Sequence, residues 1–184
     1  MQNEAPAGAA AQDDAAAPAL PSPARLEQLM FDAARLGRID VLPALFQAGV
    51  DLEARDDKGH TALILASYNG QAAATDLLLT LGAIVDAPDA GRGNTALMGV
   101  AFKGYLAIAE RLIAAGASVR RTNQAGQTAL MMAALFGHEA IVDRLLAAGG
   151  NPETVDAAGN SAITVAQAQG NEPMVARLVD RRLG

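Results

Sequence analysis

The segment best suited to binding chemistry is Gly91-Arg-Gly-Asn-Thr-Ala96, which spells G-x-G-x-x-A. In a dinucleotide-binding turn, glycines at this spacing let the backbone approach a pyrophosphate, and a helix N-terminus supplies N–H groups. The pattern is diagnostic only between a strand and a helix of a βαβ unit. Here it lies in a loop rich in glycine, so turn formation is the preferred interpretation. Nucleotide binding at Gly91–Ala96 is kept as an alternative.

The other polar residues do not suggest a catalytic or metal site. The two histidines, His60 and His138, lie about two and a half repeats apart in the array described below, too far to share a metal ion or a proton. No serine stands in a G-x-S-x-G context, and there is no cysteine to form a disulfide or a thiolate site. Asp56-Asp57 and Asp89 recur where turns begin, as turn-capping aspartates do. We therefore expect no cofactor, no metal and no enzymatic activity.

These residues belong to a repeated frame. The segments GHTALILASYNG, GNTALMGVAFKG, GQTALMMAALFG and GNSAITVAQAQG, which begin at residues 59, 93, 126 and 159, align without a gap. A second register of glycines, at 37, 70, 104, 137 and 170, steps by 33, 34, 33 and 33. A sustained period of this length indicates a stacked array of repeats. The extra residue of the 34-residue step falls in the turn that contains the G-x-G-x-x-A motif.

One repeat predicts two short helices. Thr61 is a suitable N-cap for a helix over 62–69, which Gly70 ends. A second helix over 72–81 is closed by Gly82. Isolated helices shorter than about 12–15 residues are marginal in water. Each must therefore bury its apolar side against the next repeat.

The pattern resembles the ankyrin repeat over about Leu26–Gly184. The family signature, G-x-T-P-L-H-x-A-A-x-x-G-H with a leucine-rich second helix and a terminal G-A, is matched by Thr-x-Leu at Thr61, Thr95 and Thr128, and weakens at Ser161. The resemblance implies an all-α repeat solenoid, an array of about five helix-turn-helix repeats with short β-hairpin loops. Alanine replaces the family proline throughout. The family histidine is replaced by Ile64, Met98, Met131 or Thr164, where we expect apolar packing instead of hydrogen bonds.

The chain is predicted to have two parts. Residues 1–24 are expected to be a disordered Ala/Pro-rich tail, and residues 25–184 the ankyrin repeat domain. The first helix is expected over Leu26–Leu36, and Arg177 on a polar outer face of the last helix. The expected repeats are 25–55 as an N-terminal cap, 56–88, 89–122, 123–155, and 156–184 as a C-terminal cap.

Charge and hydropathy limit the partners. A net charge of −6 argues against nucleic acid or an anionic membrane as the main partner, since both attract basic proteins. No apolar stretch is long enough to insert into a membrane, and the N-terminus does not read as a signal peptide. We expect a cytoplasmic monomer, with a periplasmic location as the alternative if an export signal has been removed or missed.

The resemblance places the partner surface on the concave face of the first helices and on the hairpin tips. Three of the chain's six aromatic residues precede the mid-repeat glycines there, and interface hot spots are often aromatic. The alternative is that these rings fill gaps in an alanine-rich core. The predicted face comprises Tyr68, Asn69, Phe102, Lys103, Leu135 and Phe136. The predicted tips comprise Lys58, His60, Arg92, Asn94, Gln124, Gln127 and Asn160.

The predicted function is a non-enzymatic scaffold that binds an unidentified protein partner. Repeats that carry T-A-L-M are similar to those of small proteobacterial ankyrin proteins, some of which are exported to the periplasm or associated with catalase and oxidative-stress defence. The resemblance thus implies a role in bacterial stress defence. A second alternative is an effector exported into a host cell.

Overall fold

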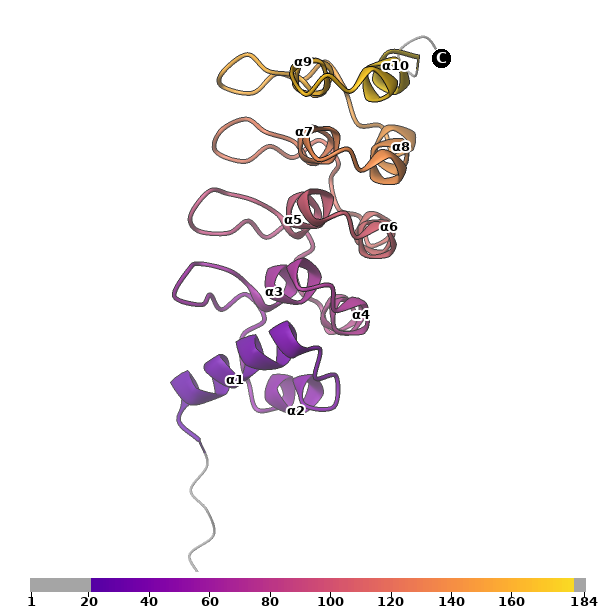
Figure 1. Ribbon diagram of the computed structural model, residues 1–184. Helices are drawn as coiled ribbons and strands as arrows, with labels where there is room; N and C mark the ends of the chain where they lie inside the picture. The colour runs from indigo at the N-terminus through magenta and orange to yellow at the C-terminus, as the bar shows by residue number, and fades with distance from the viewer. Residues whose placement is uncertain (1–20, 181–184) are drawn as a thin grey trace, which may run out of the picture.

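The computed structural model describes residues 21–180, which form five helix–turn–helix pairs stacked in one column (Figure 1). The first helices of the pairs lie in one row and the second helices in another. The protein is thus an all-α repeat solenoid, as its period predicts. The helices are α1 (Pro23–Leu36), α2 (Leu42–Gln47), α3 (Ala62–Tyr68), α4 (Ala72–Thr80), α5 (Ala96–Lys103), α6 (Leu106–Ala114), α7 (Ala129–Leu135), α8 (Glu139–Ala147), α9 (Ala162–Ala168) and α10 (Glu172–Asp180).

The inner helices α3, α5, α7 and α9 begin in the same way. A hydroxyl at the N-cap accepts the backbone N–H three residues later, at 3.2–3.4 Å. Such a cap is worth about 1 kcal/mol, because it satisfies a donor that the helix leaves unpaired. The predicted cap at Thr61 is confirmed. The capping residues are Thr61, Thr95, Thr128 and Ser161.

Helix α1 begins earlier than the predicted Leu26. The hydroxyl of Ser22 accepts the N–H of Arg25, and Pro23 occupies the first turn. Proline suits this position because its missing N–H would have no partner there. The array therefore starts inside the segment expected to be a tail. The rest of that segment, residues 1–20, lies outside the described residues.

The core lies between successive repeats. Small side chains such as Ala66, Ala101 and Ala166 are fully buried and let the inner helices approach one another. At the position of the family histidine, three of the four residues are buried, as expected. The fourth, Thr164, is exposed, and its hydroxyl accepts the N–H of Ser161 at 2.8 Å. Apolar packing fails there because no further repeat covers the last one within residues 21–180.

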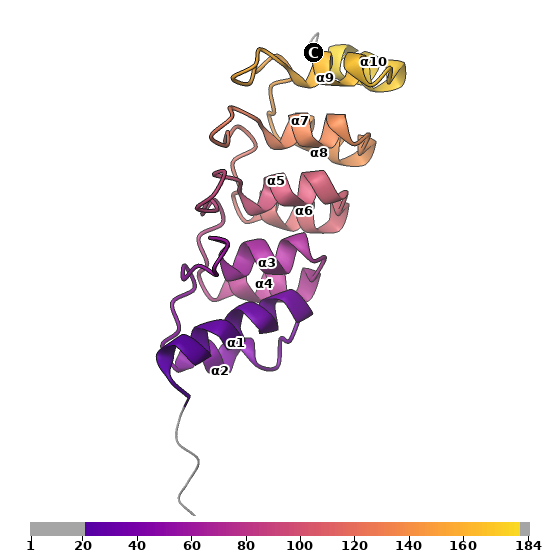
Figure 2. The ribbon, with the colours of Figure 1, turned by 60° about the vertical axis from the view of Figure 1, so that its left-hand side comes forward.

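The loops that precede the inner helices all project to one side (Figures 1 and 2). Each closes with a backbone hydrogen bond across its tip, as in a hairpin, but no strand forms among the described residues. In three loops the bond spans four residues, as from Asp56 N to His60 O. In the fourth case, the loop before α5, it spans five residues, from Asp89 N to Asn94 O, which accommodates the extra residue. Neighbouring loops are also bonded, for example from Ala90 N to Gly59 O at 3.0 Å.

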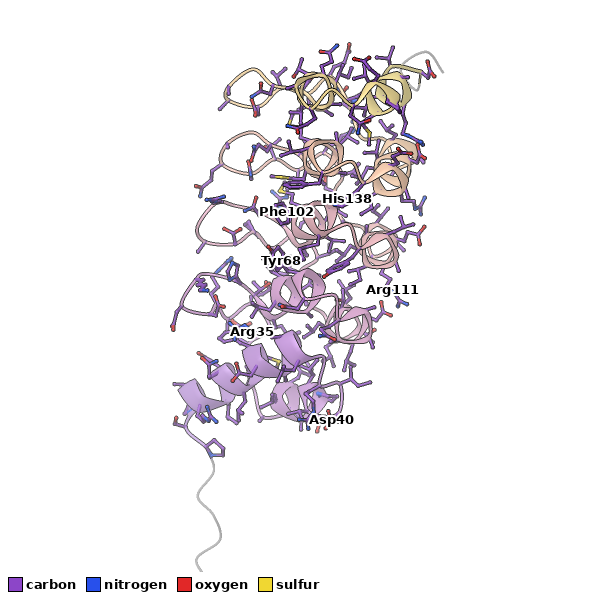
Figure 3. All side chains as sticks on the ribbon, viewed as in Figure 1. Arg35, Asp40, Tyr68, Phe102, Arg111 and His138 are labelled. Atoms are coloured by element: carbon purple, nitrogen blue, oxygen red, sulfur yellow. The ribbon has the colours of Figure 1, made fainter. Side chains whose placement is uncertain are left out.

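The outer helices are joined by ion pairs. Arg111 on α6 pairs with Asp76 on α4, on the side opposite to the loops (Figure 3). Arg177 on α10 reaches back to α8, where it pairs with Asp143 at 2.5 Å and Glu139 at 2.6 Å. Arg177, predicted to lie on a polar outer face of the last helix, is partly buried by these contacts. Its long side chain reaches the carboxylates of the preceding repeat.

Candidate functional site

A groove with a volume of about 520 Å³ runs between the loops and the inner helices α3, α5 and α7. Its floor is largely apolar and its wall is polar. We call this surface the groove. The floor residues are Ile64, Leu65, Tyr68, Met98, Gly99, Phe102, Met132, Leu135 and Phe136, and the wall residues are His60, Asp89, Arg92, Asn94, Thr95, Asn123 and Gln127.

Three aromatic rings from successive repeats contact one another along the floor. Tyr68 stacks on Phe102 with centroids 6.2 Å apart, and Phe102 meets Phe136 edge-on at 4.5 Å. Tyr68 is 42%, Phe102 39% and Phe136 46% exposed. The rings therefore pack between repeats and also leave a large apolar area uncovered. Tyr68 and Phe102 lie at the row of inner helices in Figure 3.

In the middle repeat, Gly99 lines the floor of the groove without contributing a side chain. It lies inside α5, at the register that Leu65 and Met132 occupy in the neighbouring repeats. Glycine within a helix costs roughly 0.5–1 kcal/mol relative to alanine. A Cβ atom at Gly99 would lie 3.2 Å from Cδ2 of Tyr68, so its absence lets the tyrosine ring lie against α5. We did not predict this residue, although the glycine that interrupts ALMG among ALIL and ALMM was a usable signal.

The G-x-G-x-x-A motif forms a turn around the carboxylate of Asp89. This carboxylate accepts the N–H groups of Arg92 at 2.5 Å, Gly93 at 3.1 Å and Asn94 at 3.0 Å. Burial raises the pKa of Asp89, but these hydrogen bonds lower it by more, so its pKa lies below the ordinary value. The three N–H groups are therefore not available to a phosphate. The preferred interpretation of the motif, turn formation, is confirmed.

The wall of the groove is held by side-chain amides. The NH2 group of Asn123 donates to Oδ1 of Asn94 at 2.9 Å and to Oε1 of Gln127 at 3.1 Å. Its own Oδ1 accepts two backbone N–H groups of the same loop. The amides thus connect two successive loops and hold the wall in one conformation.

Eight of the thirteen predicted contact residues line the groove. They are His60, Tyr68, Arg92, Asn94, Phe102, Gln127, Leu135 and Phe136. The structure thus places most of the predicted face and tips around one hollow.

The other five predicted contacts lie outside the lining of the groove. The side chains of three of them, Asn69, Lys103 and Asn160, contact other groups of the protein. The NH2 group of Asn69 donates to the carbonyl of Leu65 at 2.7 Å and so caps the end of α3. The ammonium of Lys103 lies over the rings of Tyr68 and Tyr105, 5.2 and 5.9 Å from their centroids, within cation–π range. The remaining three are Asn160, whose amide contacts Asp156, and Lys58 and Gln124 at exposed tips.

The two histidines have separate structural roles. Nε2 of His138 lies 3.1 Å from the carbonyl oxygen of Phe102, so the ring bridges two repeats. Nδ1 of His60 lies 3.3 Å from the carboxylate of Asp56 in its own loop. Among residues 21–180, no group of three or more His, Asp or Glu side chains is arranged to hold a metal ion.

The hydropathy of the helices bears on membrane insertion. Across residues 21–180, no helix has the length and the apolar character needed to cross a bilayer.

Comparison with known proteins agrees with the architecture. The family model described as ankyrin repeats (3 copies) matches residues 29–123 and again residues 97–183. The ankyrin repeat domain-containing protein SAT10 of Stachybotrys chartarum is 35% identical over 69 residues, which are 38% of this chain and 4% of that protein. The chain therefore spans a small part of this relative. Ankyrin repeats generally serve as protein-interaction modules. Since the two family matches extend from residue 29 to residue 183, the chain belongs to the ankyrin repeat family.

Proposed function

We propose that this protein is a non-enzymatic scaffold that binds a partner protein in the groove. One observation carries the proposal: Tyr68, Phe102 and Phe136 form a continuous, half-exposed apolar floor beneath a polar wall. Protein interfaces combine an apolar centre with a polar rim, and aromatic residues at the centre contribute most of the binding energy.

The titratable groups of the groove favour binding over acid–base catalysis. The carboxylate of Asp89 accepts hydrogen bonds from three backbone N–H groups of its own loop. His60 is turned toward Asp56 of its own loop. Arg92 is a permanent cation, since its guanidinium does not deprotonate near neutral pH. These groups can orient a partner, and within residues 21–180 no hydrogen bond or ion pair joins the side chains of Asp89, His60 and Arg92 to one another.

The test removes the exposed rings from the floor. The protein is used to capture binding partners from a cell extract, and the captured proteins are identified by mass spectrometry. Phe102→Ala combined with Phe136→Ala is expected to abolish this capture. A fully buried Phe→Ala change costs about 3–5 kcal/mol. Because these rings are half-exposed, we expect about 2 kcal/mol for each and a protein that still folds. The melting temperature is measured beside capture for each variant.

Glu110→Ala on the exposed side of the outer helix α6 is the control. It should capture the same proteins as the unaltered chain. The groove would be the wrong surface if the double variant kept its partners or if the control lost them.

A thermal-shift measurement tests the nucleotide alternative at Gly91–Ala96. Ligands that bind the folded state raise the melting temperature. We expect no shift with ATP or NAD, because the turn's N–H groups already bond to Asp89. A saturable shift that disappears in Arg92→Ala would contradict the scaffold proposal.

A further inference from the structure

We infer that the groove recognises an extended acidic segment of the partner, which places one large apolar side chain over Gly99 and a carboxylate against Arg92. The inference rests on the proposed function and adds the chemistry of what is bound. Two features of the groove carry it: a gap in the apolar floor and an arginine on the wall that makes no ion pair.

The gap is specific to the middle repeat. Leu65 and Met132 fill the floor on either side of Gly99, which contributes no side chain. The ring of Tyr68 covers one side of this gap, with Cδ2 3.2 Å from where a Cβ atom of residue 99 would lie. Phe102 lines the same groove, and both rings remain partly exposed. An apolar side chain placed there would be surrounded by apolar groups, which is the environment of an interface hot spot. The adaptable side chain of Met132 suits anchors of differing shape.

The charge comes from Arg92. Its side chain lies on the wall and is exposed, and none of the ion pairs found within residues 21–180 involves it. The nearest acid in the loop, Asp89, is already stabilised by backbone N–H groups. The guanidinium of Arg92 is therefore open to a charged group of the partner, while the carboxylate of Asp89 in the same lining is engaged with its own loop. A carboxylate placed against Arg92 would pair with it, and a basic group placed there would be repelled.

The wall favours a polypeptide as the occupant. Besides Arg92 it carries the amides of Asn94, Asn123 and Gln127, which have both donors and acceptors. An extended backbone offers the complementary N–H and C=O groups along its length. A nucleic acid would instead require several cations that follow its phosphates, and the lining supplies a single arginine.

The test is selection of a random peptide library on the full chain. Selected peptides should contain a large apolar residue and more Asp and Glu than Lys and Arg. Selection on Arg92→Glu should reverse the charge preference. Arg144→Glu, the same charge change on the outer helix α8, should leave it as it was. Arg92→Gln, expected to lose the preference without reversing it, serves if the reversed charge disturbs folding.

A second arm tests the gap with one selected peptide. Gly99→Met fills the floor with the side chain that Met132 already places at this register. We expect it to weaken peptide binding by at least about tenfold. The melting temperature is measured as well, because the new side chain removes a helix glycine but must also shift the half-exposed ring of Tyr68. Phe102→Ala with Phe136→Ala should weaken binding of the same peptide.

The outcomes separate the two proposals. Peptides that need the phenylalanines but show no acidic preference, or bind Gly99→Met normally, overturn this inference and leave groove binding intact. The inference is also overturned if the selected peptides bind the Phe102→Ala, Phe136→Ala variant as well as they bind the unaltered chain, or if the selection enriches no peptide. The capture experiment then decides on the groove itself.

Discussion

The middle repeats and the last repeat have the same pair of helices but differ in the side chains that the first helix presents to the groove. At the pair before the mid-repeat glycine, the middle repeats carry Phe102 and Phe136, whereas the last carries Ala168 and Gln169. The middle rings contact the adjacent repeats on the groove side. The last repeat has no ring to continue the row. The apolar floor therefore ends before the last repeat, although the helices continue.

The glycines show the same difference. Gly104 lies beneath the ring of His138, whereas its counterpart Gly170 faces open space. Gly59 lies against the loop of Ala90, whereas a Cβ atom added at its counterpart Gly159 would meet no atom of a neighbouring segment within 4 Å. Every repeat needs these glycines for its backbone. At Gly104 and Gly59 the next repeat also leaves no room for a side chain, so matched substitutions separate the two requirements.

The largest expected effect is at the covered helix end. Gly104→Val forces a β-branched residue to a φ of +83° and a Cβ atom to within 2.6 Å of the His138 ring. Strain of this kind costs roughly 1–3 kcal/mol, and overpacking adds a similar amount. We expect a loss of about 2–6 kcal/mol in the free energy of unfolding, measured by urea denaturation.

Gly170→Val is the matched variant. It keeps a positive φ, +66°, and removes the steric conflict, so it should lose only about 1–3 kcal/mol. Equal losses at the two positions would mean that His138 moves aside without cost and that coverage by the next repeat is unimportant there.

The second-largest expected effect on stability is at the tips of the loops. Gly59→Ala and Gly159→Ala place alanine at nearly the same φ, +81° and +82°. At Gly59 the new Cβ atom would also lie 2.6 Å from Cβ of Ala90 and 3.0 Å from its backbone nitrogen. We expect Gly59→Ala to be more destabilising by about 1–2 kcal/mol. A difference near zero in thermal unfolding would show that the loops do not restrain one another.

A smaller effect is expected from the contact between two rings. A double-mutant cycle on Phe102 and Phe136 should give a coupling of about 0.5–1.5 kcal/mol, as is typical of edge-to-face aromatic pairs. A second cycle on Phe136 and Gln169 should give a coupling near zero, because the row of rings does not reach the last repeat. Additive losses in the first cycle would make the floor three independent side chains instead of one surface.

The smallest expected effect is on the stability of the protein at low pH. The N–H of Asn160 and other donors of the loop hold the pKa of Asp156 below its ordinary value. This contribution to stability is therefore present above about pH 4 and is lost as the pH falls through the lowered pKa. Asp156→Asn should reduce the fall in melting temperature on acidification and change little at neutral pH.

Asn123 provides the precedent for this substitution. It occupies the same place in its loop, and its amide oxygen accepts the N–H groups of Ala125 and Gln127. An unaltered acid response in Asp156→Asn would assign the loss to other carboxylates, such as Asp56 and Asp89, whose pKa values are also lowered.

The positions of many elements could be predicted because their causes are local. Thr61 caps α3 through a neighbour three residues away, and glycines follow the helices where a left-handed backbone is needed. Ser22-Pro23 carried the same kind of signal for α1, and we placed the start of that helix too late. The aromatic positions could be predicted only as members of a face.

The sequence by itself determined the period, the helix pairs and the turns, because each depends on residues within one repeat. Tertiary structure decided how the side chains are used. Lys103 lies over Tyr68 of the preceding repeat, and Arg177 binds the repeat before its own. The absence of a side chain at Gly99 lets the ring of Tyr68 lie against α5. These outcomes depend on residues about one repeat away, whose distance and direction are set by the stacking of helices. Spacing along the chain predicts which side a residue faces, but not which neighbour it meets there.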